Sequence, residues 1–385
     1  MGLCTSTSTE KQMGSTFSSM ENDGQDSKNI KKAANSSTSA SRAARYGGSS
    51  STTTSADSSS MNNSSSNHTE PINDILVGVD SDEIFTCSDD KSVCCLNTGS
   101  SNGTSVSQVV QRWSEHKRSV TRMAYGPLTD QLWTCSRDLT IKRWQRGQDH
   151  SVCTIADGHD LNITALCLNP SESLLCSGSR DTVVCLWDVN TGAKIFRKKT
   201  SRNLVTCMQW RNENTVIQGS EDLKLRTWDC RDRALEAAAT MTGYVYFPLC
   251  IDVIEEHYVC TGSKGFDGVG CELRIWDMRT NQCVTEMNGH RQSIVGCRFL
   301  GNKNSIVTVS KDQTMKVWDC DKKTITADIL GHTGSQFTCV DSAASNDTNV
   351  QYVYGGAASG YSKYKYKHDD CSLEHMSTFT NVGLE

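Results

Sequence analysis

No run of apolar residues in this sequence approaches the ~20 residues that a membrane-spanning helix requires. An excess of basic residues is also missing, because 44 Asp and Glu outnumber 39 Lys and Arg and give a formal net charge of −5. Apolar residues make up 36% of the 385 positions. Neither a membrane span nor a nucleic-acid-binding surface is therefore expected.

Paired cysteine spacings of the kind that bind zinc are absent too, although the chain has 19 cysteines. Most of them fall within segments that the residue pattern predicts as β-strands, such as Cys167, Cys176, Cys185, Cys260 and Cys297. The N-terminus has no pattern of a secretory signal peptide. We therefore expect reduced thiols in the core of a cytosolic protein, and no metal or other cofactor.

The first 70 residues differ in composition from the rest of the chain. From Ser49 to Thr69 the sequence is almost entirely Ser, Thr, Asn and other small residues, without periodicity. Such a segment buries too little apolar surface to offset the entropy lost on ordering. We therefore divide the chain into a disordered tail over residues 1–70 and a folded domain over residues 71–385.

The first six residues, Met1-Gly2-Leu3-Cys4-Thr5-Ser6, fit the N-myristoylation pattern, in which Met is removed and Gly2 is acylated. One myristoyl chain gives only marginal, reversible membrane binding, so stable attachment needs a second signal. Palmitoylation of Cys4 is a candidate for that signal. The alternative is a chance match at the start of a Ser-rich tail.

A Trp closes a short β-type segment five times in the middle of the chain, at intervals of 41 to 48 residues, and four of the five are followed by Asp. These residues are Trp144, Trp187, Trp228, Trp276 and Trp318. A period of about 40 to 45 residues with a Trp-Asp signature is typical of β-propeller blades, each a unit of four strands.

The repeat extends beyond its Trp residues. In four copies a Ser lies two residues before an Asp and that Asp lies six residues before the Trp; in three of these a His precedes the Asp by 22 residues. The complete sets are His116, Ser136, Asp138 and Trp144; His159, Ser179, Asp181 and Trp187; and His290, Ser310, Asp312 and Trp318. With these motifs the chain resembles the WD40-repeat propellers. The resemblance implies that each set forms a chain of hydrogen bonds, from the indole through Ser and His to Asp, which holds the turn between the second and third strands.

A His, a Ser and an Asp together also suggest a hydrolase. Here the set recurs once per blade, and no oxyanion-hole motif lies beside it. Buried imidazole, carboxylate and indole groups need partners, because an unpaired buried polar group costs roughly 1–3 kcal/mol. We therefore interpret the sets as structural, and expect no enzymatic activity and no small-molecule substrate.

Weaker copies at both ends bring the expected number of blades to seven. In residues 87–97, Leu96-Asn97 stands where Trp-Asp would be, and residues 350–367 alternate like two strands around Ala358-Ser359-Gly360. Seven blades over residues 71–385 average about 45 residues each, which matches the internal period. The sequence therefore predicts an all-β, seven-bladed propeller, with a C-terminal outer strand over residues 373–379 that closes the last blade.

The fifth blade departs from the pattern. Residues 264–272 form an insertion before Trp276, and no His stands at the usual position. One interpretation is a turn relaxed by its glycines. The other is a loop that a partner protein grips, because binding residues tend to lie on loops held by a rigid scaffold. Phe266 is the residue that we assign to such a contact.

A narrower resemblance, to the WD repeat-containing protein 31 family, rests on three segments: residues 201–206, Gly219-Ser220-Glu221-Asp222, and residues 265–279 with the insertion. It implies a scaffold at the cilium or ciliary base that regulates intraflagellar transport and the coat-like cargo adaptor, alongside regulators of Arf-like GTPases. An acyl anchor suits a protein that works at the ciliary membrane. We expect protein partners, and a cytoplasmic, membrane-associated location.

A second function class has its own motif. Arg231 and Arg279 each follow a Trp-Asp by two positions in adjacent blades, similar to substrate receptors of cullin–RING ubiquitin ligases. The alternative is that an exposed Arg at this position is common in propellers. Co-purification with the adaptor of the ligase, set against localisation to cilia, separates the two functions.

Overall fold

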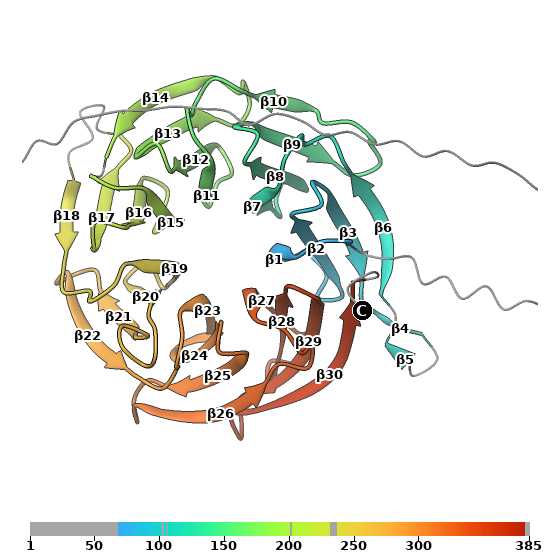
Figure 1. The fold of residues 1–385 in the computed structure, drawn as a ribbon, viewed down its shortest axis with the longest axis vertical. Coiled ribbons are helices and arrows are strands. Elements are labelled where there is room, and N and C mark those ends of the chain that lie inside the picture. The colour runs from blue at the N-terminus through green and yellow to red at the C-terminus, as the bar shows by residue number, and fades with distance from the viewer. Residues whose placement is uncertain (1–67, 102–103, 106, 201, 232–236, 382–385) are drawn as a thin grey trace, which may run out of the picture. The chain divides into compact units, whose positions relative to one another are not determined.

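The computed structural model describes residues 68–101, 104–105, 107–200, 202–231 and 237–381. The tail predicted over residues 1–70 therefore lies almost wholly outside the described residues, as do Gly2 and Cys4. The described strands form seven four-stranded antiparallel sheets, which follow one another in chain order around a central opening (Figure 1). The prediction of an all-β, seven-bladed propeller is confirmed.

Each blade is made of four strands that are close in sequence, running from the central opening to the rim. Blade 1 contains β1 (Ile72–Val77), β2 (Glu83–Ser88), β3 (Val93–Asn97) and β6 (Gln108–Trp113), and blade 2 contains β7 (Val120–Gly126), β8 (Gln131–Ser136), β9 (Ile141–Gln145) and β10 (Cys153–Ile155). Blade 3 contains β11 (Ile163–Leu168), β12 (Leu174–Ser179), β13 (Val183–Asp188) and β14 (Lys194–Lys199). Blade 4 contains β15 (Val205–Trp210), β16 (Thr215–Ser220), β17 (Lys224–Asp229) and β18 (Ala237–Met241).

The remaining three blades have the same order of strands. Blade 5 contains β19 (Pro248–Ile254), β20 (Tyr258–Ser263), β21 (Leu273–Asp277) and β22 (Gln282–Met287); blade 6 contains β23 (Ile294–Leu300), β24 (Asn302–Ser310), β25 (Thr314–Asp319) and β26 (Thr324–Leu330); blade 7 contains β27 (Phe337–Ala344), β28 (Val350–Ala357), β29 (Gly360–Lys367) and β30 (Ser372–Thr380). A short two-stranded ribbon, β4 (Ser100–Ser101) and β5 (Thr104–Ser105), connects β3 to β6.

The burial of each strand follows from its place in the blade. The middle strands β12 and β13 are buried along nearly their whole length, since neighbouring blades cover both of their faces. The outer strand β14 alternates between exposed and half-buried residues. The core therefore lies between blades: Trp187 of blade 3 packs in one cluster with Trp133 and Ile155 of blade 2.

The cysteines contribute to this core. All of those in the described part of the chain are free thiols, and most of them are buried. Among the described residues, no helix has the length and the apolar sequence needed to span a membrane. No group of three or more His, Cys, Asp or Glu in the described segments is placed to hold a metal ion.

The ring closes by packing and not by strand exchange. All four strands of blade 7 come from the C-terminal end of the chain, and β30 is the outer strand, as predicted. Ile72 and Leu96 of blade 1 pack in one cluster with Tyr354 and Tyr361 of blade 7. The backbone N–H of Val77 also donates to a carboxylate oxygen of Asp341, at 2.8 Å. The first and last blades are thereby joined at the central opening.

Hydrogen bonds between neighbouring inner strands repeat around the ring. The hydroxyl of Thr121 donates to the backbone carbonyl of Ile163 at 2.7 Å, and that of Thr164 donates to the carbonyl of Val205 at 2.6 Å. Thr206 makes the same bond to Pro248, at 2.6 Å. Because these residues occupy equivalent positions in successive blades, each bond fixes the spacing of one blade to the next.

Candidate functional site

The three predicted His and Asp sets form chains of hydrogen bonds that run from the Trp to the turn. In blade 3 the indole N–H of Trp187 donates to the Ser177 hydroxyl at 2.9 Å, which contacts Nε2 of His159 at 2.8 Å. Nδ1 of His159 donates to Asp181 at 3.2 Å, and Asp181 also accepts the backbone N–H groups of Asp160 and Val183. Blades 2 and 6 repeat this chain through Thr134 and Thr308.

The hydroxyl in each chain is not the one predicted, and Ser136, Ser179 and Ser310 must be corrected. Trp187 lies opposite Leu175 in the sheet, so the indole reaches the diagonal neighbour Ser177 and falls short of Ser179. Ser179 donates instead to the backbone carbonyls of Leu161 and Asn162. Ser136 and Ser310 likewise bind backbone carbonyls, and all three hydroxyls accept the N–H of the Asp two residues on.

Blade 1 contains a fourth set, which the sequence analysis missed. His68 is fully buried and contacts Asp90 and the hydroxyl of Thr86, both at 2.9 Å, with Leu96 in place of the Trp. The spacing from His68 to Asp90 is the same 22 residues as in the other sets, so this signal was present in the sequence. The propeller therefore includes His68, which the predicted boundary at residue 71 assigns to the tail.

Blades 4 and 5 contain variants of the same arrangement. In blade 4 the indole of Trp228 donates to the side-chain oxygen of Gln218 at 2.8 Å, and no His takes part. In blade 5 the hydroxyl of Tyr244 contacts Thr261 at 2.8 Å, where the imidazole stands in other blades. Thr261 also accepts the indole N–H of Trp276, at 3.2 Å. The turn is thus held even where the His is missing.

Hydrogen bonds within these sets shift the pKa values of the Asp and His side chains in opposite directions. Burial alone would raise the pKa of Asp138, but hydrogen bonds from His116 and Thr140 hold that pKa below its ordinary value. The same balance lowers the pKa of Asp312. Burial alone would lower the pKa of His68, but its hydrogen bond to Asp90 raises that pKa to about 9. Each ionised side chain is hydrogen-bonded to other members of its set, as expected for groups that stabilise the fold.

The insertion in blade 5 is both an ordered turn and an exposed surface. Phe266 and Val269 exchange backbone hydrogen bonds at 3.0 and 2.9 Å, and the N–H of Gly268 donates to the carbonyl of Arg291 in the neighbouring blade at 2.9 Å. Gly270 has a φ of 76°, and a Cβ there would lie 2.2 Å from the ring of Tyr246. The loop is therefore fixed in shape and attached to blade 6.

Five apolar side chains lie on or beside this loop, and we call them the blade-five patch: the exposed Val245, Phe266 and Val269, and the half-buried Tyr246 and Phe247. Phe266 is 54% exposed, Val269 58% and Val245 53%. The rings of Tyr246 and Phe266 meet edge to face at 6.0 Å, while the Lys264 ammonium lies 4.9 Å from the ring centre of Phe247 and 5.5 Å from that of Phe266. Contacts within the fold thus hold the aromatic side chains of the patch in place.

Arg231 and Arg279 have matching conformations in adjacent blades. The guanidinium of Arg231 donates to both carboxylate oxygens of Asp229, and that of Arg279 donates to both oxygens of Asp277, each pair with a shortest distance of 2.6 Å. Arg279 also donates to the Tyr258 hydroxyl at 3.0 Å. The hydrogen bond from Arg279 lowers the pKa of Asp277 to about 2. Both Arg side chains remain largely exposed.

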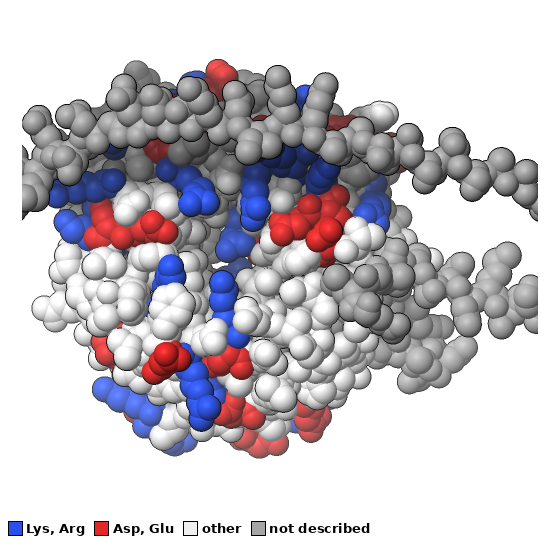
Figure 2. Space-filling model, viewed as in Figure 1, with Lys and Arg blue, Asp and Glu red and all other residues white. Residues whose placement is uncertain are grey.

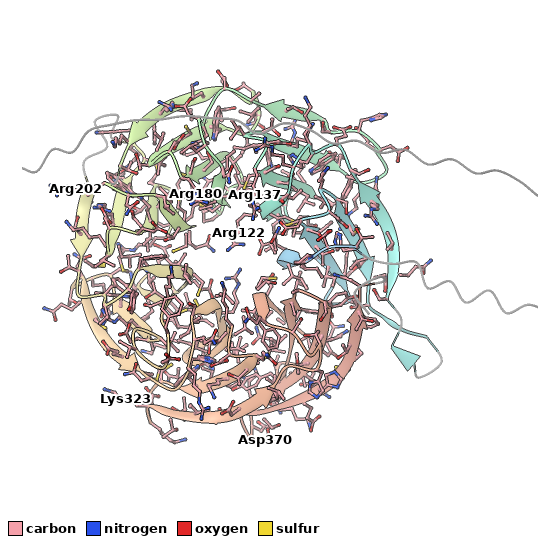
Figure 3. The ribbon with its side chains drawn as sticks, viewed as in Figure 1. Arg122, Arg137, Arg180, Arg202, Lys323 and Asp370 are labelled. Atoms are coloured by element: carbon pink, nitrogen blue, oxygen red, sulfur yellow. The ribbon has the colours of Figure 1, made fainter. Side chains whose placement is uncertain are left out.

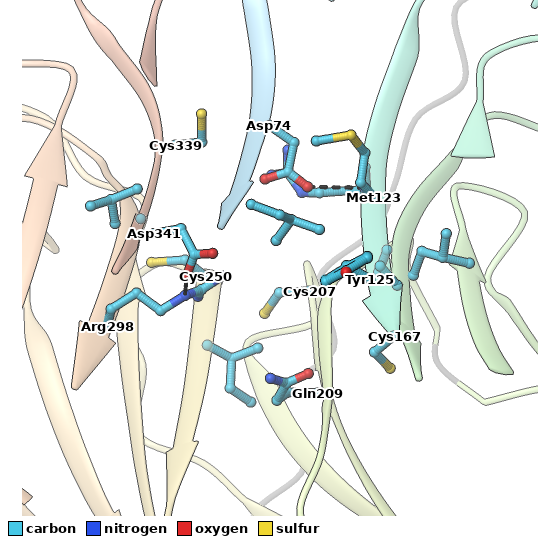
Figure 4. A pocket seen from close by; sticks show the side chains of 18 of the residues that line it. Asp74, Met123, Tyr125, Cys167, Cys207, Gln209, Cys250, Arg298, Cys339 and Asp341 are labelled. Atoms are coloured by element: carbon cyan, nitrogen blue, oxygen red, sulfur yellow. Dashed lines mark hydrogen bonds and ion pairs between the residues drawn. The ribbon is translucent and has the colours of Figure 1, made fainter. Parts of the chain in front are cut away.

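Inner-strand residues line a channel cavity of about 380 Å³ along the axis of the ring (Figure 4). Its charged groups are engaged with the walls: Arg298 donates to Asp341 at 2.9 Å, and Asp74 accepts the backbone N–H of Met123 at 3.0 Å. Asp252, beside the channel, accepts the N–H of Phe299, and burial raises the pKa of Asp252 to about 6. These carboxylates thus bind the inner strand of a neighbouring blade.

A second cavity of about 400 Å³ opens where the channel meets the face that contains the turns after β2, β8, β12, β16 and β24. We call it the channel mouth, and its charged lining residues are Arg122, Arg137, Arg180, Glu221 and Lys311. Figure 3 labels three of them around the central opening, and Figure 2 shows Lys and Arg side chains bordering the hollow at the centre of this face. Four positive and one negative side chains leave the mouth with a net charge of +3.

Comparisons with known families agree with this architecture. The model of the WD domain, G-beta repeat, matches residues 60–97 and 281–319, and the model of the anaphase-promoting complex subunit 4 WD40 domain matches residues 123–213. These segments of the chain match WD40 repeats. The matched segments include the first three strands of blade 1, most of blade 2, all of blade 3 and the first three strands of blade 6.

Two curated proteins are similar to parts of this chain. The chain is 25% identical over 285 residues to nuclear distribution protein PAC1 of Arthroderma otae, covering 64% of this chain and 60% of that protein. It is 23% identical over 267 residues to the ribosome biogenesis protein WDR12 homolog of Drosophila virilis, covering 63% and 60%. The chain spans about 60% of the length of these curated relatives.

A solved structure extends the likeness over more of the chain. The crystal structure of the WD40 beta propeller domain of Doa1 superposes with a TM-score of 0.64 and 18% identity, covering 80% of this chain and 94% of that one. At this identity the likeness shows the WD40 fold alone.

Proposed function

We propose that this WD40 propeller is a non-enzymatic protein-interaction scaffold, and that its blade-five patch is a contact for a protein partner. The observation that carries the proposal is the exposure of Phe266, Val269 and Val245 together on one ordered loop region. Contiguous exposed apolar side chains mark interaction surfaces, and aromatic anchors dominate binding energy at interfaces. Phe266 is the anchor, and Lys264 with Tyr246 holds its ring in place.

The blade-five loop is also held in a defined conformation, which favours partner binding. Because the loop is already closed by its own backbone bonds and attached to blade 6 through Gly268, a partner orders little of it on binding. The entropy cost of association is lower for such a preformed surface. The propeller beneath it keeps the loop at a constant position.

We expect Phe266→Ala to weaken capture of protein partners about tenfold while the melting temperature changes by no more than about 1 °C, because an exposed anchor contributes to an interface and not to the core. The measurement is quantitative affinity purification of the tagged full chain from ciliated cells. Leu128→Ala is the matched control, since Leu128 is 75% exposed but belongs to blade 2. A large loss of stability with partner capture retained would make the loop purely structural.

We further propose that the scaffold works at the cilium or ciliary base, where it regulates intraflagellar transport and cargo-adaptor recruitment with regulators of Arf-like GTPases. The support is the resemblance of residues 201–206, 219–222 and 265–279 to the WD repeat-containing protein 31 family, together with the N-terminal acylation pattern. Imaging of the tagged chain in ciliated cells tests the location. A uniform cytoplasmic signal with no enrichment at cilia would contradict this proposal.

Membrane attachment through Gly2 and Cys4 belongs to the same proposal. We expect Gly2→Ala to release the protein from membranes, and Cys4→Ser to leave weak, reversible association, because each buried CH₂ contributes about 0.8 kcal/mol and one chain is marginal. The propeller is expected to fold normally in both variants. Intact-protein mass spectrometry of the chain from eukaryotic cells gives the chemistry, and an N-terminus without a fatty acyl group would contradict the membrane attachment.

The alternative function is that of a substrate receptor of a cullin–RING ubiquitin ligase. It is favoured by the matching Asp-bound conformations of Arg231 and Arg279 in adjacent blades. Co-purification with the ligase adaptor that is lost in the double variant Arg231→Ala, Arg279→Ala would support this function. Adaptor binding that is absent in the unmodified chain would eliminate it.

A further inference from the structure

We propose that the channel mouth and the blade-five patch form one continuous docking surface, and that it binds an extended segment of a partner protein in which acidic residues lie next to an apolar anchor. The inference rests on the proposed scaffold function and names the chemistry of its partner. Four observations support it: the charge of the mouth, the availability of its cations, its continuity with the patch, and the charge of the chain as a whole.

The mouth has the opposite sign of charge from the protein. Its lining carries a net charge of +3, whereas the complete chain carries −5. The positive side chains come from equivalent positions: Arg137, Arg180 and Lys311 each lie between the Ser and the Asp of their own turn. Turns of blades 2, 3 and 6 therefore bring like charges to one cavity. Such an arrangement favours a negatively charged ligand there.

The cations of the mouth are available to such a ligand. Arg180 and Lys311 are exposed, and neither forms an ion pair within the described part of the chain. Arg137 is half exposed, and its nearest carboxylate is that of Asp89 at 3.9 Å. Structural guanidinium groups elsewhere are held closer, as that of Arg226 is to Asp222 at 2.5 Å. Unlike Arg122, which donates to the backbone carbonyls of Asn73 and Thr121, these three cations are thus not committed to the fold.

The mouth continues into the blade-five patch without interruption. Phe247 lines the mouth and belongs to the patch, and the ammonium of Lys264 lies between the rings of Phe247 and Phe266. A bound segment that places carboxylates beside Arg180 and Lys311 therefore meets an aromatic surface within the same extended stretch. The bound segment is therefore expected to contain both acidic and apolar residues, and not acidic residues alone.

Other occupants fit this surface less well. A nucleic acid gains most from an extended basic surface, whereas this cavity has four cations, borders an apolar patch and lies on an acidic protein. The N-terminal tail of the same chain is also disfavoured, because residues 1–67 contain six Lys and Arg against five Asp and Glu. The occupant is therefore an acidic segment of another protein.

The test uses the purified full chain and an array of ten-residue peptides. Each peptide of the first set contains four Glu residues and one Phe or Leu, and the position of the Phe or Leu varies from peptide to peptide. The second set has Gln in place of Glu. The third set keeps Glu but has Ser in place of the Phe or Leu. We expect selective binding of the first set, weakened about tenfold by Arg180→Glu, by Lys311→Glu and by Phe266→Ala, and reduced by high salt. Lys323→Glu, at the outer rim in Figure 3, is the charge-matched control and is expected to bind normally.

Several results would overturn the inference. These are no selective binding by the unmodified chain, equal binding of the Glu and Gln sets, an equal effect of Lys323→Glu, or stronger binding of a single-stranded oligonucleotide than of the acidic peptides. Melting temperatures of all variants separate loss of binding from loss of fold. If partners captured from cells depend on Phe266 but not on Arg180 or Lys311, the scaffold function stands and the acidic-segment inference fails.

Discussion

Asp181→Ala is expected to lower the free energy of unfolding by about 2–4 kcal/mol, because removing one partner of a buried hydrogen-bonded network leaves the others unsatisfied. Asp181 accepts Nδ1–H of His159 and the backbone N–H groups of Asp160 and Val183. Without the carboxylate, His159 is no longer linked to the turn, and the imidazole that contacts Ser177, the partner of the Trp187 indole, is held less firmly. Urea unfolding of the full chain gives the measurement.

The control for Asp181 is a second carboxylate near the same blade. The side chain of Asp157 is 81% exposed and pairs only with Lys194, at 3.3 Å, in the described structure. Exposed pairs contribute about 0–1 kcal/mol, so Asp157→Ala is expected to change stability very little. Equal unfolding midpoints for Asp181→Ala and Asp157→Ala would show that the hydrogen-bond chain does not stabilise its blade.

Acidification is expected to destabilise the propeller steeply below about pH 4. Despite burial, which opposes the effect, hydrogen bonds from histidines and hydroxyls hold the pKa values of Asp90, Asp138 and Asp312 below their ordinary value. Their contribution to stability is complete above the unfolded pKa and is lost as the pH falls toward the folded pKa. Urea midpoints between pH 7 and pH 3 measure it.

Two other side chains, Asp252 and His68, are expected to change the pH dependence of stability in the opposite direction. Burial raises the pKa of Asp252 to about 6, so its contribution favours the folded state at low pH and is lost as the pH rises toward 6. His68, with its pKa raised to about 9, contributes below its unfolded value and loses that contribution as the pH rises through 9. Asp252→Asn is therefore expected to remove a decline between pH 4 and 6. Stability that is constant from pH 7 to pH 3 would contradict the assignment of the carboxylates.

The extent of the ring was predictable because the repeat is encoded by spacing. Each Asp follows its His by 22 residues and precedes its Trp by six. These intervals place the two middle strands of each blade in the sequence. The middle hydroxyl was not predictable in the same way. Its position is set by the diagonal pairing of Trp187 with Ser177, which depends on strand register, and the residue alternates between Ser and Thr in different blades.

His68 was missed for a different reason. Its neighbours are Ser, Asn and Thr, so composition assigned it to the tail, although its distance from Asp90 fits the repeat. A buried imidazole between Thr86 and Asp90 shows that local composition is a weaker guide than the position of a residue within a repeat.

The surface could be predicted only in part. The insertion that contains Phe266 was visible as a departure from the period, but the exposure of its ring and the position of Lys264 against it depend on the packing of blades 5 and 6. The channel mouth is composed of residues far apart in sequence, such as Arg137 and Lys311. Aligning the turns of all blades would have shown these cations at one position, but not that they share a cavity.

The most direct test of the scaffold proposal is site-specific crosslinking in ciliated cells. A photoreactive phenylalanine analogue is placed at position 266 of the full chain, and in a separate chain at position 128, where Leu128 is even more exposed. The proposal predicts discrete protein adducts from position 266 and none from position 128. Crosslinking that is equal at the two positions, or absent at position 266, would contradict the assignment of the blade-five patch as the contact for a protein partner.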